Sequence, residues 1–162
     1  MHTSLKPGAH ILDIGPPNIM ADRMRDAGYN VVNTDFDLDR EPEKLANFEA
    51  DAVTAFEILE HLINPMGVLQ HIRPNQLFTT VPLDLWFAKA YRSASDPWDR
   101  HFHEFEDWQF DWLLEASGWK KLRAEKWTSP IKNLGIRPLL RKYTPRYYAV
   151  ESTRETDHGG KA

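Results

Sequence analysis

The sequence predicts an α/β protein built on a doubly wound, largely parallel sheet. Two observations lead to this fold class: the apolar segments are short and nearly continuous, as in strands buried on both faces, and they alternate with helical segments. A chain of 162 residues is long enough for one core and too short for two ordinary domains. We therefore expect a single domain over residues 1–152 and a disordered tail over residues 153–162.

The first predicted unit is a strand followed by a helix. HILDIG (10–15) is a short apolar run closed by glycine, which indicates a buried strand. In NIMADRMRDAG (18–28), Asn18 suits the N-cap and Gly28 suits the C-terminal stop. This segment predicts a helix whose apolar stripe is formed by Ile19, Met20, Met24 and Ala27.

The middle of the chain continues the alternation. Residues 37–50 have little periodicity and predict a loop with one helical turn, whereas the aromatic-rich residues 83–105 predict an inserted lid. Pro65 suits the first turn of a helix, because its missing N–H costs little there. The predicted strands are YNVVNTDF (29–36), ADAVTAF (50–56) and QLFTTVP (76–82), and the predicted helices are ILEHL (58–62) and PMGVLQHI (65–72).

The last third predicts one amphipathic helix and two strands. EDWQFDWLLEASGW (106–119) has a helical period and glycine near its end, and its buried face is expected to carry Trp108, Trp112, Leu113 and Ala116. The strands are expected near WKKLRAEKW (119–127) and RYYAVES (146–152), separated by a basic, proline-containing connection.

Composition and charge limit the location and the partners. No apolar run approaches the roughly 20 residues that cross a bilayer, and the N-terminal MHTSLKPGAH lacks the apolar stretch of a signal peptide. We therefore expect a cytoplasmic protein without membrane insertion. Cysteine is absent, which excludes disulfides and thiolate metal sites. Residues 120–146 are basic, but few aromatic residues interleave with them and the net charge is −4, so we expect no specific nucleic-acid binding.

Motifs at the predicted strand ends resemble class I S-adenosylmethionine-dependent methyltransferases. The motifs are LDIG after the first strand, Asp35 closing the second, and AFEILEHLINP after the third, and HFHEFEDWQFDWLLEASGW is similar to a later helix of the family. The resemblance covers about residues 8–128. It implies a Rossmann-like sheet with an antiparallel last strand, and the short spacing between Asp35 and Asp51 implies a compact version lacking the usual third strand.

The resemblance also implies S-adenosylmethionine as cofactor. Parallel sheets bind ligands at the carboxyl ends of their strands. Asp35 would accept hydrogen bonds from the ribose hydroxyls, Phe36 would flank the adenine, and the helix beginning near Asn18 would offer free N–H groups to the methionyl carboxylate. The cofactor-binding residues expected on this basis are Asp13, Gly15, Pro16, Asp35, Phe36, Phe56 and Glu57.

The loop after the first strand departs from the family pattern. The family usually has a run of glycines here, whereas this chain has GPPN, in which Pro16 and Pro17 lack an N–H. A dinucleotide-binding enzyme is the nearest alternative, but it would require G-x-G-x-x-G, which GPPNIM does not supply.

The FEILEHL segment (56–62) places two carboxylates and an imidazole at helical spacing. Glu57, Glu60 and His61 are either structural, or His61 is a general base, or the three bind Mg²⁺ or Mn²⁺ together with His103 or His101. The last pattern resembles metal-dependent 2′-O-methyltransferases of small RNAs. The metal set considered is Glu57, Glu60, His61 and His103.

The predicted function is methyl transfer from S-adenosylmethionine to an oxygen or nitrogen atom of a small molecule, with His61 as the catalytic residue. A non-catalytic binding module with a degenerate methyltransferase fold and a metal-dependent RNA 2′-O-methyltransferase are the alternatives. The predicted lid carries a cluster of aromatic residues that form either an acceptor pocket, as the resemblance implies, or an ordinary core under a long loop: Trp86, Phe87, Tyr91, Trp98, Phe102 and Phe105. The sequence specifies neither the acceptor nor the oligomeric state.

Overall fold

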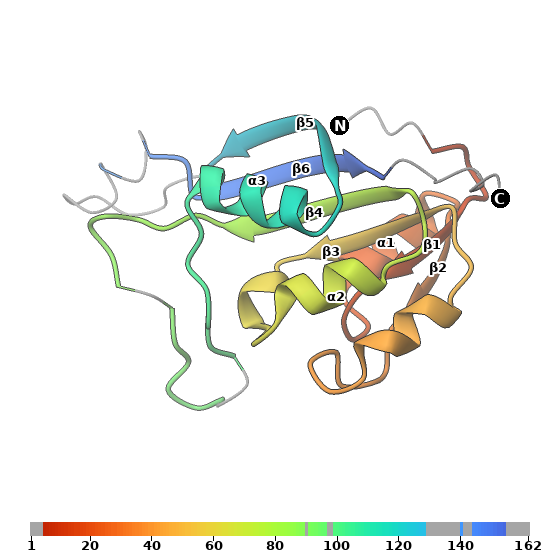
Figure 1. Ribbon diagram of the computed structural model, residues 1–162, viewed down its shortest axis with the longest axis horizontal. Coiled ribbons are helices and arrows are strands. Elements are labelled where there is room, and N and C mark those ends of the chain that lie inside the picture. The colour runs from red at the N-terminus through yellow and green to blue at the C-terminus, as the bar shows by residue number, and fades with distance from the viewer. Residues whose placement is uncertain (1–4, 90, 97–98, 129–139, 141–143, 155–162) are drawn as a thin grey trace, which may run out of the picture.

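The computed structural model describes residues 5–89, 91–96, 99–128, 140 and 144–154. They form one six-stranded sheet with helices on both sides (Figure 1). No helix in these ranges is long and apolar enough to cross a bilayer. In chain order the elements are β1 (His10–Asp13), α1 (Ile19–Asp26), β2 (Asn30–Asn33), the 3-10 helix η1 (Pro42–Asn47), β3 (Ala52–Phe56), the 3-10 helix η2 (Leu59–His61), α2 (Pro65–His71), β4 (Gln76–Pro82), α3 (Asp107–Ala116), β5 (Lys120–Trp127) and β6 (Tyr147–Thr153).

The strand order across the sheet is β2-β1-β3-β4-β6-β5. The strands β2, β1, β3 and β4 pair in parallel, whereas β6 is antiparallel to both β4 and β5. The predicted α/β fold with a mostly parallel sheet and an antiparallel last strand is confirmed. Between β2 and β3 the described chain forms only η1, the single helical segment predicted there, so β2 is left at the edge of the sheet.

The two faces of the sheet are covered differently, because alternate residues of a strand point to opposite sides. One face packs against η1, α2 and α3, which lie in front of the sheet in Figure 1. The core there includes Leu12, Val53, Ala55, Leu77, Val81 and Val150 from the strands, with Leu45, Leu69, Phe110 and Leu114 from the helices. On the opposite face, α1 is the only helix among the described residues. The predicted sheet has helices on both faces, and the described residues cover the two faces unequally.

Helix α1 begins and ends as predicted, but its apolar stripe is not core. The Asn18 side chain caps the helix, and Gly28, at φ 90°, follows its C-terminus. Only Ala21 is buried, while Ile19 and Met20 are exposed. The reason is that, in the part of the chain that the structure describes, no other helix lies on this face for the stripe to pack against.

Helix α3 buries a different face from the one predicted. Phe110 and Leu114 are in the core, whereas the exposed fractions of Trp108 and Trp112 are 55% and 64%. The Trp108 indole Nε1 donates to Glu106 Oε2 at 2.9 Å, which holds the ring at the helix N-terminus and away from the sheet. The apolar residues of this helix form two stripes, and the stripe that carries Phe110 and Leu114 faces the sheet.

The described chain continues past the predicted domain boundary at residue 152. Thr153 belongs to β6, and the Arg154 guanidinium donates to the carbonyls of Ile72, Leu69 and Ser117 at 2.8, 3.1 and 3.0 Å. It also lies 4.4 Å from the centroid of the Trp119 ring. Residues 155–162 of the predicted tail, and most of the basic connection before β6, lie outside the described residues.

Candidate functional site

A cavity of about 450 Å³ opens at the carboxyl ends of β1, β2 and β3, and we call it the strand-end cavity. Its volume falls in the range of roughly 300–1,000 Å³ that is usual for small-ligand sites. Its lining includes the predicted residues Gly15, Pro16, Asp35, Phe36 and His61, together with Thr34, Asp37, Leu38, Asp39, Ile58 and Leu62. Segments predicted separately from three strand ends therefore meet at one place.

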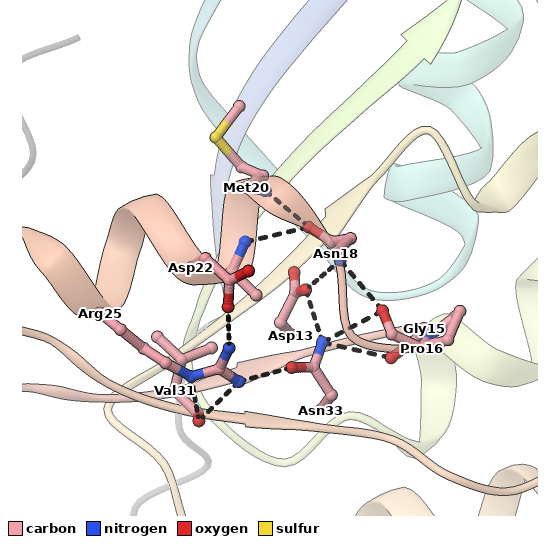
Figure 2. Close-up of polar contacts among 10 residues, drawn as sticks. Asp13, Gly15, Pro16, Asn18, Met20, Asp22, Arg25, Val31 and Asn33 are labelled. Atoms are coloured by element: carbon pink, nitrogen blue, oxygen red, sulfur yellow. Dashed lines mark hydrogen bonds and ion pairs between the residues drawn. The ribbon is translucent and has the colours of Figure 1, made fainter.

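A buried carboxylate holds these strand ends together. Asp13 is 1% exposed and accepts three hydrogen bonds: from Thr54 Oγ1 at 2.6 Å, from Asn18 Nδ2 at 2.8 Å and from Asn33 Nδ2 at 2.9 Å. Figure 2 shows both amides directed at the carboxylate. Asp13, predicted to bind the cofactor, does not line the strand-end cavity. Its carboxylate positions the loop above it by joining β1, β2, β3 and the N-cap of α1.

The loop after β1 is shaped for close approach but has few free donors. Gly15 adopts φ 116°, which favours glycine, and its N–H donates to Thr34 Oγ1 at 2.8 Å. The Asn18 Oδ1 atom accepts the N–H groups of Met20 and Ala21, both at 2.9 Å. The expectation that the start of α1 offers free N–H groups is therefore wrong for these two residues, because the capping side chain already uses them.

The β2 end supplies an available carboxylate and an aromatic ring. Asp35 is exposed, lines the strand-end cavity, and has no hydrogen-bond partner among the described residues. Phe36 stacks on Phe48 with 6.2 Å between ring centroids, and the Lys44 ammonium lies 5.6 Å from the Phe36 centroid. These contacts fix the ring beside the Asp35 carboxylate.

The FEILEHL segment does not form the predicted helix. Glu57 has φ 52°, the only positive φ of a non-glycine residue in the described chain, and only Leu59–His61 form a short 3-10 turn. The three polar side chains consequently separate. Glu57 and Phe56 line a second cavity on the face of the sheet that carries α1, Glu60 is buried, and His61 opens onto the strand-end cavity that Asp35 also lines.

His61 has the protonation geometry of a base. Its Nδ1 lies 3.0 Å from the carbonyl oxygen of Arg100, which can only accept, so Nδ1 carries the proton and Nε2 has the free electron pair. Desolvation lowers the pKa of His61, so the ring is neutral at physiological pH. Glu60, 1% exposed, lies beside it, with Oε1 3.9 Å from His61 Nε2. Burial, together with the nearby carboxylates of Glu57 and Glu104, raises the pKa of Glu60 to about 8.

The residues able to share a metal ion differ from the predicted set. Ligand atoms of Glu60, His61 and His101 lie within 4.8 Å of one another, and the two imidazole rings meet edge to face at 4.9 Å. Neither Glu57 nor His103 belongs to this group. Glu57 turns towards the other cavity, and the His103 ring stacks on Phe105 at 5.6 Å between centroids. Glu60 Oε2 is buried without a hydrogen-bond partner among the described residues.

The lid segment is tied to this turn by its backbone. The N–H groups of Phe102 and His103 donate to the Glu60 carbonyl at 2.8 and 3.2 Å. Its described aromatic side chains are divided between the core and the surface: Phe105 is in the core, whereas Trp86, Tyr91 and Phe102 are exposed. Trp98 lies outside the described residues. The predicted lid therefore contributes His101 and two backbone hydrogen bonds to the turn at Glu60.

Sequence reasoning missed several residues that shape the site. Thr34 and Asn33 hold the loop after β1, and Ile58 lines the strand-end cavity and lies against Gly15, 3.6 Å from where a Cβ atom would stand. Asn33 carried one usable signal, because it is a polar residue directly after the apolar pair Val31 and Val32 and two positions before Asp35. His101 was weighed only as a substitute for His103, since spacing alone does not show which ring turns towards Glu60.

Comparison with known proteins finds similarity only at the level of structure. No protein-family model and no curated protein sequence matches the chain. A methyltransferase from Bacillus halodurans, described as putative, superposes with a TM-score of 0.61 at 12% identity, covering 94% of this chain and 95% of that one. Magnesium protoporphyrin IX methyltransferase from Synechocystis, solved with bound S-adenosylmethionine, gives 0.57 at 12% identity over 92% of this chain and 71% of its own.

A third neighbour is phosphoethanolamine N-methyltransferase 2 from Haemonchus contortus, with a TM-score of 0.59 at 11% identity over 94% of this chain and 50% of that one. At such identities the likeness concerns the fold. The chain has the fold of class I S-adenosylmethionine-dependent methyltransferases.

Proposed function

We propose that the protein transfers a methyl group from S-adenosylmethionine to an oxygen or nitrogen atom of a small molecule. The observation that carries this proposal is the meeting of Gly15, Asp35, Phe36 and His61 around the strand-end cavity. The fold is shared with methyltransferases, one of which was solved with S-adenosylmethionine bound. The same fold occurs in a [4+2]-cyclase, so the fold by itself does not decide the reaction.

The residues present fit the nucleoside part of the cofactor better than its amino-acid part. The free Asp35 carboxylate suits two ribose hydroxyls, and the Phe36 ring suits a flat base. At the other end, Pro16 and Pro17 have no N–H, and Asn18 occupies the N–H groups of Met20 and Ala21. We infer a cofactor held mainly through its adenosine half.

Bound S-adenosylmethionine supplies an electrophilic methyl group, and the chain has to align the acceptor and receive its proton. Methyl transfer to a good nucleophile depends mainly on alignment and exclusion of water. In this proposal His61 Nε2, free because Nδ1 is held by the Arg100 carbonyl, accepts a proton from the acceptor. The lowered pKa of His61 keeps that nitrogen unprotonated at neutral pH.

Calorimetric titration with S-adenosylhomocysteine tests this function. We expect 1:1 binding that Asp35→Ala weakens by roughly 1–3 kcal/mol, through the loss of charge-assisted hydrogen bonds. Asp26→Ala, which removes an exposed carboxylate from the end of α1, is the matched control and should bind as the unmodified protein does. Absence of binding by the unmodified protein would instead favour the non-catalytic binding module, which the occupied N–H groups of α1 would explain.

A second candidate is a metal-dependent form of the same reaction, favoured by the grouping of Glu60, His61 and His101. Two imidazoles and one carboxylate suit Mn²⁺ better than Mg²⁺, which prefers oxygen ligands. The unpartnered Oε2 of Glu60 would find a partner in such an ion. These residues would hold the ion, which would act as a Lewis acid beside the strand-end cavity.

Binding of Mn²⁺ alone, followed by electron paramagnetic resonance, tests the metal-dependent form without an activity assay. We expect His101→Ala to abolish Mn²⁺ binding and His10→Ala, an exposed histidine on β1, to leave it intact. Retention of Mn²⁺ in His101→Ala would contradict the assignment of this cluster.

A further inference from the structure

The second cavity occupies the face of the sheet that carries α1. It measures about 780 Å³ and is distinct in its lining from the strand-end cavity; we call it the sheet-face cavity. Its walls are mainly apolar and aromatic, with Ile11, Met20, Met24, Phe56, Phe78 and Trp127 as the main contributors. The strand residues among them belong to the face on which α1 is the only described helix. A hollow of this size and character suits an apolar small molecule.

Among the described residues, the charged side chains that line the sheet-face cavity are both carboxylates. Glu57 lies at the carboxyl ends of the strands and Glu125 lies on β5, and this described part of the lining contains no lysine, arginine or histidine. Arg123, on β5, pairs with another carboxylate, since its Nη2 donates to Glu151 Oε2 at 2.6 Å. The Arg146 guanidinium lies 5.1 Å from the Tyr147 ring centroid, and its charge also lowers the pKa of Glu57. The carboxylates of the described lining suit a cationic ligand.

Glu57 has the features of a residue held in place for a ligand. Its φ of 52° is unusual for a side chain other than glycine, asparagine or aspartate, and such strain persists only when the surroundings enforce it. The Glu57 N–H donates to the Thr80 carbonyl at 3.0 Å, which fixes the turn. Burial raises the pKa of Glu57, and its interactions with Thr80, His101 and Arg146 lower it in part. Glu57 lines the sheet-face cavity, whose other walls are mainly apolar.

We propose that the sheet-face cavity binds a small apolar amine. Its ammonium group donates to the Glu57 carboxylate, and its apolar body lies on Phe78 and Trp127. A carboxylate in partly apolar surroundings favours an ammonium over an alcohol, because the ion pair is screened less there than in water. The site is separate from the strand-end cavity, so it does not depend on the proposed methyl transfer.

Three probes that share a phenylethyl body and differ in head group test the charge preference by calorimetric titration at pH 7.5: 2-phenylethylamine, 2-phenylethanol and 3-phenylpropanoate. We expect the amine to bind at least about tenfold more tightly than the alcohol and the carboxylate not to bind. Failure of all three to bind at millimolar concentration, or binding of 3-phenylpropanoate as tight as that of the amine, would overturn the proposal.

Variants locate the ammonium group. Glu57→Gln should reduce amine affinity to that of the alcohol, whereas Glu125→Gln, the matched carboxylate on β5, should change it less than about threefold. Trp127→Ala, a partly exposed position that folding should tolerate, should weaken the amine and the alcohol alike. Unchanged amine affinity in Glu57→Gln would contradict the assignment. Asp35→Ala should bind the amine normally, which separates this test from that of the cofactor.

Discussion

The two faces of the sheet are built from the same strands but differ in how they are packed. In β4, Leu77 enters the core beneath α2 and α3, while its neighbour Phe78 faces the sheet-face cavity. The α2 and α3 face is closed and apolar. The α1 face combines apolar walls with Asp13, Thr54 and Glu151, each buried and hydrogen-bonded. Polar groups of this kind are retained where chain segments must be positioned rather than merely packed, and both cavities border that arrangement.

The largest expected difference between the faces concerns stability. Leu69→Ala, in α2 on the closed face, removes a fully buried side chain and should lower the free energy of unfolding by about 2–5 kcal/mol. Met24→Ala, in α1 on the other face, removes a half-buried side chain beside a cavity and should cost about 1 kcal/mol or less. Urea denaturation of both variants measures the two losses in the free energy of unfolding. Equal losses would mean that the two faces are equally packed.

A pH-dependent effect should follow from Glu60. Its folded pKa of about 8 exceeds the ordinary value of 4.5, so between these pH values the folded state binds more protons than the unfolded state. The stability contributed by this group is present below pH 4.5 and falls as the pH rises to 8, with a slope approaching about 1.4 kcal/mol per pH unit.

Glu60→Gln isolates this contribution, because glutamine does not titrate and His61 is present in both proteins. Denaturation in the presence of a chelator should show the variant gaining stability relative to the unmodified protein as the pH rises from 5 to 8. A difference in unfolding free energy that is constant over that range would show that Glu60 ionises normally in the folded protein.

The N-cap of α1 should have a smaller effect. Asn18→Ala removes the acceptor for two N–H groups and one of the three donors to Asp13, and should cost about 1–2 kcal/mol. Asn18→Ser keeps a capping oxygen and should recover about half of the loss. Thermal unfolding measures both. A serine variant as unstable as the alanine variant would place the effect in the Asp13 contact alone.

The smallest expected effect is at the sheet edge. Arg25 Nε and Nη2 donate to the Val31 carbonyl at 3.3 and 3.2 Å, and Nη2 donates to Asn33 Oδ1 at 2.7 Å, as Figure 2 shows. The side chain therefore covers part of the open edge of β2. Arg25→Ala should cost below about 1 kcal/mol and increase self-association in sedimentation velocity, and Arg23→Ala should do neither. If the Arg25→Ala variant stays monomeric at high protein concentration, Arg25 does not protect this edge from self-association.

The sequence was sufficient to predict the architecture and insufficient to predict the side-chain arrangement. Asn18, Gly28 and the apolar strands act through local backbone preferences, so the sheet and α1 could be located. The directions of Glu57 and His101 depend on long-range contacts, above all the hydrogen bonds from Phe102 and His103 to the Glu60 carbonyl. Helical spacing suggested a shared face for FEILEHL, but the turn forced at Glu57 separates its side chains.

The face that α3 buries also could not be predicted from the sequence, because it depends on packing. Phe110 and Leu114 form one apolar stripe and Trp108 and Trp112 another, four residues apart in each case, so periodicity cannot choose between them. The choice is made by the space between α2, Phe105 and Tyr148, where Phe110 lies 5.3 and 6.3 Å from the two ring centroids.

Hydrogen–deuterium exchange with and without saturating S-adenosylhomocysteine tests most directly whether the cofactor binds at the strand-end cavity. We expect protection of peptides covering residues 34–39 and 58–62, which line that cavity, and unchanged exchange for residues 120–127 on β5. Cofactor binding at the strand-end cavity would be contradicted by protection confined to β5 and β6. It would also be contradicted if calorimetry showed binding but no strand end were protected.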